Sequence, residues 1–468
     1  MIEENFLNSL PYAYERDSSA EQIRENYEAY KGKSVRIAGR IIRIREVGKI
    51  IFADLLDQSG SIQLYFEFGL LKERFQEVKK LNRGDIIGVS GKVFKTDPGE
   101  ISIKVEDFSL LMKAMRVLPD KWKGLKDVEL RYRNRHLDFI VNPQVRKIFL
   151  IRHEAIRLIR EFMNSRGYIE FETPAIQPLY GGADAEPFKT FVNTLNEEDY
   201  LRISDELYLK RLIIGGFEKV YEIYKAFRNE DIDSTHSPEF TMLEAYEAYT
   251  DYNGMMKLNE EMFEYIAKGI FGTTKLAYQG STIDMKGPFK RVEFVKSINE
   301  KVGEDILELE DEELFRLAEK NGIRFEKGKR FRAHAYDKLF SKLVQPELIE
   351  PTFAIDFPKE MSPLARPNRK DPRLVERFEL YISGIELSNA YSELNNPIIQ
   401  RKNFEEQEER AKMGDKEAEP LDLDFVEAME YGMPPTGGIG IGIDRLIMIL
   451  TNQTSIKEVI AFIMEKRR

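Results

Sequence analysis

The chain has 468 residues, of which 42% are hydrophobic and 11% aromatic, so it can bury one large core and a smaller second one. No apolar run approaches the roughly 20 residues needed to span a bilayer, and the acidic N-terminus is unlike a signal peptide, so we expect a cytoplasmic protein with no membrane partner. The net charge of −10 disfavours non-specific coating of nucleic acid, and the absence of Cys excludes disulfides, thiolate zinc sites and cysteine nucleophiles.

The first 112 residues predict a small nucleic-acid-binding barrel. Residues 1 to about 30 are polar with spaced aromatic residues and predict an N-terminal helical segment. Between residues 31 and 112, short alternating runs rich in β-branched residues are separated by turn sequences, and one helical insert, LLKERFQEVKKL, interrupts them. Five strands with such an insert are typical of an OB-type barrel, which commonly presents a strand face to single-stranded nucleic acid.

Two features of this barrel are candidates for an RNA-binding surface. The aromatic side chains that could stack on bases are Phe52, Tyr65 and Phe66, although each also fits a core position. Basic residues gather along the first strand. They are Arg36, Arg40, Arg43, Arg45 and Lys49. A solvated strand edge explains these charges as well as an RNA-binding face does, so both interpretations stay open.

A change in composition marks the boundary between two domains. Residues 113–130 contain a Pro, a Gly and the only Trp, and they predict a linker. Residues 131–468 predict a second domain that begins with an amphipathic helix over residues 145–167, followed by a strand, YIEFETPAI, broken at Pro174. Later strands and helices lack the regular alternation of a parallel sheet, so we expect an α+β fold with an antiparallel sheet flanked by helices. The charged residues 272–345 predict an inserted helical module.

Two glycine motifs resemble nucleotide-binding loops but fail in detail. Gly32-Lys33-Ser34 would end a P-loop, but Tyr27 stands where that loop needs its first Gly, and a strand follows where a helix is required. Residues 437–445, GGIGIGIDR, contain no G-x-G-x-x-G spacing. Their glycines instead permit a close approach of the backbone to a ligand, with Arg445 supplying charge at its edge.

Residues 227–249 form a first group of candidate ligand-binding residues. Two aromatic, acid-rich, strand-like pieces flank a polar turn, around which lie Arg228, Glu230, His236 and Phe240. An Arg can pair with a phosphate or a carboxylate, while an aromatic ring and a His can sandwich a purine. Taken alone, however, this segment is better explained as an ordinary charged hairpin.

Residues 377–395 form a second group. Glu379, Glu386 and Glu393 recur every seven residues, a spacing that does not by itself place them on one face. The abundance of Tyr, Ile and Gly favours two strands with a bend near Ser383-Gly384. Carboxylates inside a pleated core are costly unless they meet a metal or a cationic ligand, and the four scattered His residues offer no alternative metal site. Hard oxygen ligands of this kind suit magnesium shared with phosphate.

Three of these blocks occur in an order that resembles motifs 1, 2 and 3 of the class II aminoacyl-tRNA synthetases. They are YIEFETPAI with Pro174, FRNE…HSPEF with Arg228, and GIGIDR with Arg445. With an OB-type domain in front, they resemble the aspartate, asparagine and lysine subgroup. Over nearly the whole chain the finer resemblance is to the lysyl-tRNA synthetase family. It is carried by RYRNRHLDFIVNP, PLYGGADAEPF, DELYLKRLIIGGFEKVYEI, SPLAR, SNAYSELN and PPTGGIGIGIDR.

This resemblance implies an enzyme that activates L-lysine with ATP and Mg²⁺ and transfers it to the 3′ end of tRNA(Lys). It implies that the barrel binds the anticodon and that motif 1 builds a homodimer. The chain departs from the family pattern at two places. They are His136-Leu137-Asp138-Phe139, where Tyr-Leu-Asp-Leu is usual, and Phe462-Ile463-Met464-Glu465, where Phe-Pro-Ala-Met is usual. The second departure bears on the packing of the C-terminal strand more than on the chemistry.

The resemblance also implies roles for single residues. Those implied in catalysis are Arg228, Glu230 and Arg445. Those implied in ATP binding are Arg228, Glu230, His236, Ser237, Phe240, Glu386, Leu387, Gly442 and Arg445, and the magnesium ligands would be Glu379 and Glu386. Those implied in lysine binding are Gly182, Glu206, Glu244, Tyr246, Asn389, Tyr391 and Glu393, the last opposing the ε-ammonium. Those implied in anticodon contact are Phe52, Gln63 and Glu100.

Three alternatives compete with this interpretation. A relative that modifies a protein instead of tRNA would resemble the catalytic domain alone, whereas this chain also has the OB-like domain. A catalytically idle RNA-binding relative would be expected to lack an ATP or metal residue, yet Arg228, Glu379 and Arg445 are present. An aspartate or asparagine enzyme is disfavoured by Glu206 and Glu393, because an acidic side chain would need cations in that pocket.

Overall fold

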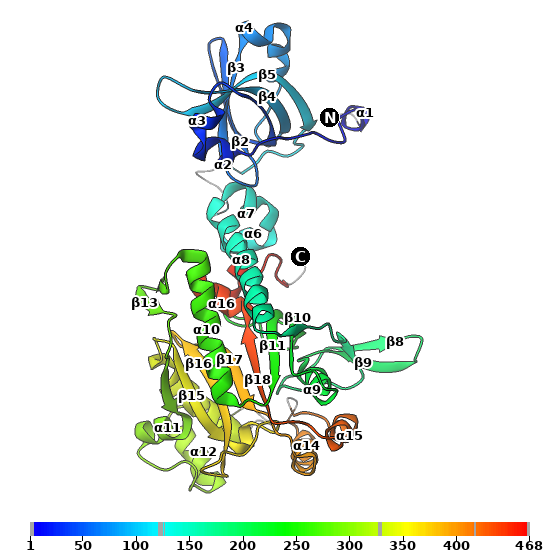
Figure 1. The fold of residues 1–468 in the computed structure, drawn as a ribbon, viewed down its shortest axis with the longest axis vertical. Coiled ribbons are helices and arrows are strands. Elements are labelled where there is room, and N and C mark those ends of the chain that lie inside the picture. Colours follow the sequence, from blue (N-terminus) through cyan, green and yellow to red (C-terminus); the bar gives the residue numbers. More distant parts are fainter. Residues whose placement is uncertain (1–3, 120–124, 126, 326–329, 416–417, 466–468) are drawn as a thin grey trace. The chain divides into compact units, whose positions relative to one another are not determined.

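The computed structural model describes residues 4–119, 125, 127–325, 330–415 and 418–465 (Figure 1). The chain forms two compact units, Met1–Lys126 and Asp127–Arg468, and their division falls within the predicted linker 113–130. Each unit has its own hydrophobic core. No helix in the described ranges is long and apolar enough to cross a membrane.

The first unit is a closed five-stranded barrel, which confirms the OB-type prediction. Its strands pair in the order β1-β2-β3-β5-β4. They are β1 (Ser34–Val47), β2 (Ile50–Leu56), β3 (Ser61–Glu67), β4 (Ile86–Lys95) and β5 (Ile101–Met112). The insert before β4 contains α4 (Phe68–Leu71), η1 (Lys72–Arg74) and α5 (Phe75–Val78). The N-terminal segment forms three short helices, α1 (Glu4–Asn8), α2 (Ala20–Glu25) and α3 (Tyr27–Tyr30).

A β-bulge in β1 decides which side of the barrel the arginines face. The pairing of β1 with β2 shifts between Ile41 and Arg43, so the buried positions change from odd to even numbers along the strand. Arg43 and Arg45, beyond the bulge, therefore lie on the same outer side as Arg36 and Arg40. Without the bulge, strict alternation would have split this basic group between the two sides.

The second unit is built on an eight-stranded sheet with the order β14-β15-β16-β17-β18-β11-β10-β6. Its strands are β6 (Ile169–Glu170), β10 (Lys219–Phe227), β11 (Glu239–Ala248), β14 (Lys290–Glu293), β15 (Thr352–Pro358), β16 (Leu374–Ile382), β17 (Ile385–Ser392) and β18 (Thr436–Gly442). All neighbours are antiparallel except the outer pairs β14–β15 and β10–β6. The second unit therefore has the predicted antiparallel sheet flanked by helices.

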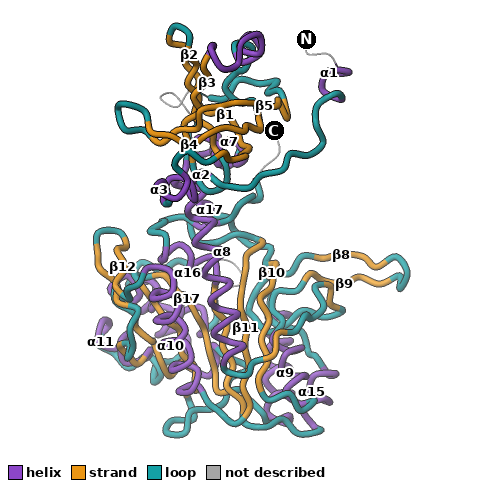
Figure 2. Tube along the Cα trace, turned by 45° about the horizontal axis from the view of Figure 1, so that its top comes forward, coloured by secondary structure: helices purple, strands orange, loops and turns teal. Residues whose placement is uncertain are grey.

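Further strands and helices surround this sheet. Smaller strands are β7 (Ile176–Gln177), β8 (Lys189–Val192), β9 (Glu197–Leu201), β12 (Lys275–Tyr278) and β13 (Ser281–Asp284). The β8–β9 hairpin extends away from the rest of the unit (Figure 2). The helices are α6 (Val128–Arg133), α7 (Arg135–Val141), α8 (Pro143–Ser165), α9 (Glu206–Ile214), α10 (Tyr252–Phe271), α11 (Phe294–Val302), α12 (Asp311–Lys320), α13 (Arg332–Leu343), α14 (Pro397–Lys412), α15 (Leu423–Glu430), α16 (Ile443–Leu450) and α17 (Ile456–Val459), with 3-10 turns η2 (Gln345–Glu347) and η3 (Lys359–Met361).

Side-chain alternation gives the large sheet two different faces. Helices α8, α10 and α16 cover one face (Figure 1), and Leu243 and Ala245 of β11 join the apolar core beneath them. Because successive side chains of a strand point to opposite faces, Glu244 and Tyr246 lie on the other face. The same strand thus supplies the core on one side and polar groups on the other.

Two predictions of local structure need correction. The motif 1 strand is much shorter than YIEFETPAI, because Pro174 and the turn that follows end the pairing after Ile169–Glu170. Residues 272–345 are not a purely helical module. Strand β14 joins the large sheet beside β15, and the β12–β13 hairpin buries Leu276 and Ile283 in the main core. Only α11, α12 and α13 match the prediction, since the charged stretch masked the shorter apolar alternation of the strands.

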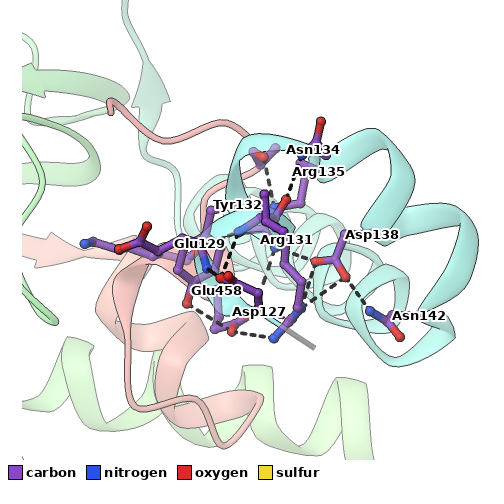
Figure 3. A network of polar contacts seen from close by, with 12 residues as sticks. Asp127, Glu129, Arg131, Tyr132, Asn134, Arg135, Asp138, Asn142 and Glu458 are labelled. Atoms are coloured by element: carbon purple, nitrogen blue, oxygen red, sulfur yellow. Dashed lines mark hydrogen bonds and ion pairs between the residues drawn. The ribbon is translucent and has the colours of Figure 1, made fainter. Parts of the chain in front are cut away.

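A buried network of charges joins the start of the second unit to its C-terminal segment (Figure 3). Arg135 and Asp138 are fully buried and form an ion pair of 3.0 Å. Arg131 donates to Asp138 at 3.1 Å and to Glu458 at 3.0 Å. Arg135 also donates to backbone carbonyls of the C-terminal segment, including that of Ala461 at 3.2 Å. Each of the four charges Arg131, Arg135, Asp138 and Glu458 therefore has an opposite partner in this network.

Candidate active site

The opposite face of the sheet bears a cavity of about 340 Å³. Every site residue predicted in the second unit lines it. They are Gly182, Glu206, Arg228, Glu230, His236, Ser237, Phe240, Glu244, Tyr246, Glu379, Glu386, Leu387, Asn389, Tyr391, Glu393, Gly442 and Arg445. The chain thus brings together residues that are more than two hundred positions apart in sequence.

Glycines on β18 make room for this cavity. Ile439 and Ile441 point into the core, so Gly438, Gly440 and Gly442 fall on the cavity face. A Cβ atom at Gly438 would lie 2.0 Å from Oε1 of Glu393, so the carboxylate could not keep its position if Gly438 carried a side chain. The glycine run predicted to permit close approach therefore admits a carboxylate of the protein itself as well as any ligand.

One end of the cavity is rich in buried carboxylates. Glu244 accepts hydrogen bonds from Ser204 at 2.9 Å, from Tyr246 at 2.9 Å and from Tyr224. Glu393 is 1% exposed, and its backbone N–H donates to the carbonyl oxygen of Thr436 on β18 at 2.8 Å. Such an environment favours a ligand that carries positive charge, because buried carboxylates are costly without one.

Lys210 is the cation of this end. Its ammonium is fully buried and forms ion pairs with both Glu206 and Glu393. Burial raises the pKa of Glu393, and Lys210 opposes that rise. Burial likewise raises the pKa of Glu206, again against the effect of Lys210. One ammonium therefore serves two glutamates, and the carboxylate charge is only partly compensated.

Glu419 adds another carboxyl to the same end. It is 2% exposed and lines the cavity, and burial together with the charges of Asp184 and Glu206 raises its pKa to about 8. Its Oε2 atom has no hydrogen-bond partner among the described residues. The carboxyl groups of this region thus outnumber the ammonium of Lys210, and a ligand with more than one positive group would favour their ionised forms.

The other end of the cavity carries cationic and aromatic groups. Arg445 donates to the Glu386 carboxylate at 3.2 Å and lies 3.2 Å from Nε2 of His236. Nδ1 of His236 lies 2.8 Å from Asp233, so this ring can hold its proton toward Asp233 and accept from Arg445. Arg228 lies over the ring of Phe240, with its guanidinium carbon 5.2 Å from the ring centre. These groups suit a phosphate chain joined to an aromatic base.

Glu379 and Glu386 lie on the hairpin of β16 and β17, with the predicted bend at Ser383 and Gly384, both of which have positive φ. Glu379 is held by Arg377 and Tyr381. Burial raises the pKa of Glu379 to about 7; Arg377 lowers it and Glu386 raises it. Two carboxylates beside a phosphate-binding end are a donor set that fits magnesium, which typically takes one or two carboxylates plus phosphate oxygens. The protein atoms of the described residues alone form no cluster of three or more such ligands.

Helix α8 holds the motif 3 end of the cavity in place. Arg152 forms an ion pair with the buried Asp444 and donates to Thr241 Oγ1 at 2.9 Å. Asp444 also accepts from the backbone N–H of Thr241 at 2.6 Å. Since Arg445 follows Asp444 directly, Arg152 fixes the start of α16 against β11 and thereby the position of the Arg445 guanidinium.

The barrel residues predicted to contact an anticodon lie in the first unit. Phe52 packs edge-to-face with Tyr65 at 5.4 Å, and Arg45 lies over the Phe52 ring at 4.9 Å. Gln63 accepts from Ser102 at 3.0 Å, and Glu100 is exposed. Both rings are partly exposed, so they can stack on bases.

Phe66 does not share this surface. Its ring is fully buried and packs edge-to-face on Phe108, with the ring centres 6.0 Å apart. It is therefore a core residue, and its prediction as a stacking platform was wrong, since alternation along β3 points it inward.

Comparison with protein families agrees with this geometry. Residues 127–466 match the family described as tRNA synthetases class II (D, K and N), and residues 35–111 match an OB-fold nucleic acid binding domain. The chain belongs to the class II tRNA synthetases of the D, K and N group. The matched ranges correspond to the two compact units, so the OB-type barrel and the catalytic sheet of the synthetase are both present.

Several curated relatives of the synthetase resemble it over almost their whole length. A lysine–tRNA ligase of Thermoanaerobacter pseudethanolicus is 48% identical over 98% of this chain and 93% of its own. Lysine–tRNA ligase 2 of Methanosarcina mazei is 50% identical over 98% of this chain and 91% of its own. A lysine–tRNA ligase of Saccharolobus solfataricus is 48% identical over 99% of this chain and 95% of its own.

Sequence reasoning missed several residues of the synthetase site. Lys210 could have been noticed through its i, i+4 spacing from Glu206 on α9, a common ion-pair spacing. Arg152 carried no local signal, because its partners lie on other segments. Arg377 is two residues from its partner Glu379, a spacing that places both side chains on one face of a strand. Glu419 lies in a loop, and nothing in its local sequence distinguishes it from a solvent-exposed acid.

Proposed function

We propose that this synthetase is a lysine–tRNA ligase, which activates L-lysine with ATP to lysyl-adenylate and transfers the lysine to the 3′ end of tRNA(Lys). The observation that carries the proposal is the buried, under-compensated carboxylate end of the cavity, with Glu393 as its innermost charge. The names of the relatives agree with this substrate.

Lysine matches the charges of the cavity. It brings an α-ammonium and an ε-ammonium, and it brings one carboxylate that must meet a cation. We assign the α-amino end to Gly182, Glu206 and Glu244, and the ε-ammonium to Glu393, with Tyr246, Asn389 and Tyr391 orienting the chain. These assignments rest on the family resemblance, and the location of every one of these residues in the cavity supports them. A neutral or acidic side chain would leave Glu393 with only its share of the Lys210 ammonium, without the second cation that the ε-ammonium of lysine supplies.

Activation requires the lysine carboxylate to attack the α-phosphorus of ATP while pyrophosphate leaves. Arg228 lines the cavity and would neutralise both the carboxylate and the α-phosphate, and Glu230 lines the cavity as well. Phe240 would stack on adenine, and His236 with Arg445 would take the terminal phosphates. Ser237, Leu387 and Gly442 would line the rest of the nucleotide site. No protein nucleophile is required by this reaction.

Glu379 and Glu386 would hold Mg²⁺ against the ATP phosphates. When bound, the ion would neutralise phosphate charge and stabilise the leaving pyrophosphate. The protein's part is to aim these carboxylates, which Arg377 and Tyr381 do for Glu379 and Arg445 does for Glu386.

The two alternatives to tRNA charging fit less well. A relative that modifies a protein would not need the OB-fold domain that matches residues 35–111. An idle RNA-binding relative would not need Arg228, Glu379 and Arg445 to converge on one cavity. Phe52, Gln63 and Glu100 are proposed to contact the anticodon, supported by the exposed rings and the outward arginines of the same barrel.

A homodimer built on motif 1 is also proposed, together with a cytoplasmic location. Exposed apolar side chains occur on α8 and the strands that follow it, at Leu150, Ile169 and Ile176. Such residues on a soluble surface favour an interface with a second copy. Sedimentation equilibrium would test this, because a monomer at all concentrations would exclude it.

ATP–pyrophosphate exchange with magnesium, offering each standard amino acid in turn, tests the proposed function. Exchange driven by lysine alone, followed by lysine transfer to tRNA(Lys), is the expected result. Exchange driven by aspartate or asparagine would overturn the assignment of the pocket. Exchange with lysine but no charging of any tRNA would favour the relative that modifies a protein.

A further inference from the structure

The ε-ammonium of a bound lysine would meet an ammonium already present in the protein. Lys210 is 0% exposed and pairs with Glu206, four residues earlier on α9, and with Glu393, which follows β17. The family resemblance gives Lys210 no role in binding lysine or ATP. A fully buried Lys in a substrate pocket needs an explanation, because its burial costs free energy unless its charge serves the site.

The two oxygens of Glu393 have different surroundings. Oε2 forms the ion pair with Lys210. Oε1 has no hydrogen-bond partner among the described residues and lies over Gly438, in the space that a side chain there would fill. Glu393 also lines the cavity. One oxygen is therefore committed to the protein, and the other is available to a ligand.

Other charged and titratable groups from several elements surround this pair. They are Asp205 before α9, Glu206 on α9, Glu244 and Tyr246 on β11, Tyr391 on β17, and Glu419 in the loop before α15. Most of these are acids or phenols, which disfavour a further negative charge. Without Lys210, Glu393 would therefore lose the cation that offsets its burial, and its protonated form would be favoured.

We propose that Lys210 is a positioning residue for amino-acid specificity: it binds one oxygen of Glu393, favours the ionised form of that carboxylate, and leaves the other oxygen for the ε-ammonium of lysine. This inference rests on the proposed lysine–tRNA ligase function. It treats Lys210 as a partner of substrate recognition. The opposite view is that Lys210 merely fills the empty pocket and competes with the substrate.

The two views predict opposite effects of Lys210→Met, which keeps the length of the side chain and removes its charge. If Lys210 supports Glu393, the KM for lysine at neutral pH rises by about tenfold or more, the change that corresponds to a pKa shift of about one unit. Burial raises the pKa of Glu393 to about 8 even with Lys210 in place, so the KM of the variant should fall only at a higher pH than the KM of the natural chain does. If Lys210 competes with the substrate, the KM for lysine falls at every pH.

The experiment is lysine-dependent ATP–pyrophosphate exchange by the full chain, from below neutral pH to above the pKa of Glu393. The kcat and the KM for ATP are measured in parallel. We expect the KM for ATP to change by less than about twofold, since Lys210 touches no group at the nucleotide end. Lys219→Met is the matched control, because it removes a Lys from an ion pair with Glu247 outside the cavity. It should leave the lysine KM and its pH profile unchanged.

Two further variants keep the test decisive if Lys210→Met folds poorly. Lys210→Arg retains the charge and should keep the lysine KM and its pH profile close to those of the natural chain. In a Glu393→Gln background, Lys210→Met should add little, because the group through which Lys210 acts is already neutral. An additive loss in the double variant, or a lysine KM that Lys210→Met leaves unchanged at every pH, would overturn the proposal.

Norleucine, which lacks the ε-amino group of lysine, gives an independent measure. In Lys210→Met at about pH 6.5, the discrimination between lysine and norleucine should shrink, because a protonated Glu393 no longer needs a cation. The natural chain separates this proposal from the proposed function. If it shows no lysine-driven exchange, the proposed function fails, whereas normal exchange with unaltered Lys210 variants defeats only the role of Lys210.

Discussion

Two clusters of buried charge in the second unit differ in how their charges are balanced. In the network around Arg135, Asp138 and Glu458, each carboxylate meets guanidinium groups of the protein (Figure 3). In the cavity, Lys210 is shared between Glu206 and Glu393, and Glu419 has an oxygen with no hydrogen-bond partner in the described structure. The first arrangement holds segments together, whereas the second leaves free energy to be gained by binding a cation.

The same chemistry therefore serves stability in one place and recognition in the other. Breaking the balanced cluster should harm folding and leave the lysine site intact. Removing charge from the unbalanced cluster should harm recognition and leave folding intact or improved.

Glu393→Gln should lower kcat/KM for lysine by more than about a hundredfold, which corresponds to a loss of about 3–5 kcal/mol of transition-state stabilisation. The reason is that the ε-ammonium would be buried without its opposite charge. Lysine-dependent exchange measures the effect, and thermal unfolding should show a stability equal to or above that of the natural chain. A variant that lost stability instead would place Glu393 with the structural charges.

Arg135→Met should lower the free energy of unfolding by about 3 kcal/mol or more, because it leaves Asp138 buried with fewer cationic partners. Urea unfolding of the second unit measures this loss. Arg133→Met is the matched control: its ion pair with Glu465 is partly exposed and should contribute about 0–1 kcal/mol. The KM for lysine should be unchanged in the folded fraction of both variants.

The free energy of unfolding of the ligand-free protein should fall as the pH rises from about 5 to about 8. The folded-state pKa of Glu419, about 8, lies above its ordinary value of 4.5, so the folded state holds a proton that the unfolded state has already lost in this window. Glu419→Gln should make this fall in the free energy of unfolding smaller by on the order of 2 kcal/mol. Calorimetry at several pH values checks this, and an unchanged slope would contradict it.

Arg152→Met should raise the KM for ATP by about tenfold while changing the KM for lysine by less than about twofold. Its loss frees Asp444 and lets Arg445 move away from the terminal phosphates. Arg157→Met, on the same helix, removes an exposed Arg paired with Glu154 and Glu161 and serves as the control. Equal effects of the two substitutions would mean that α8 contributes only stability.

Local sequence was enough to predict most of the framework. Short alternating runs predicted the barrel, the period of α8 predicted a long amphipathic helix, and Ser383-Gly384 predicted the hairpin that carries Glu379 and Glu386. These features depend on periodicity and turn chemistry, which a short stretch of chain contains in full. The resemblance to the synthetases then identified the cavity residues, since its motifs are read from the sequence itself.

Tertiary structure alone decided how the buried charges combine. The spacing of Glu206 and Lys210 permitted an ion pair on one helix, but only the fold brings Glu393 from another segment onto the same ammonium. The bulge in β1 and the strand β14 were likewise missed, because each depends on pairing with distant residues. Sequence determines which charges the protein has, and burial with long-range pairing determines which of them are balanced and which await a ligand.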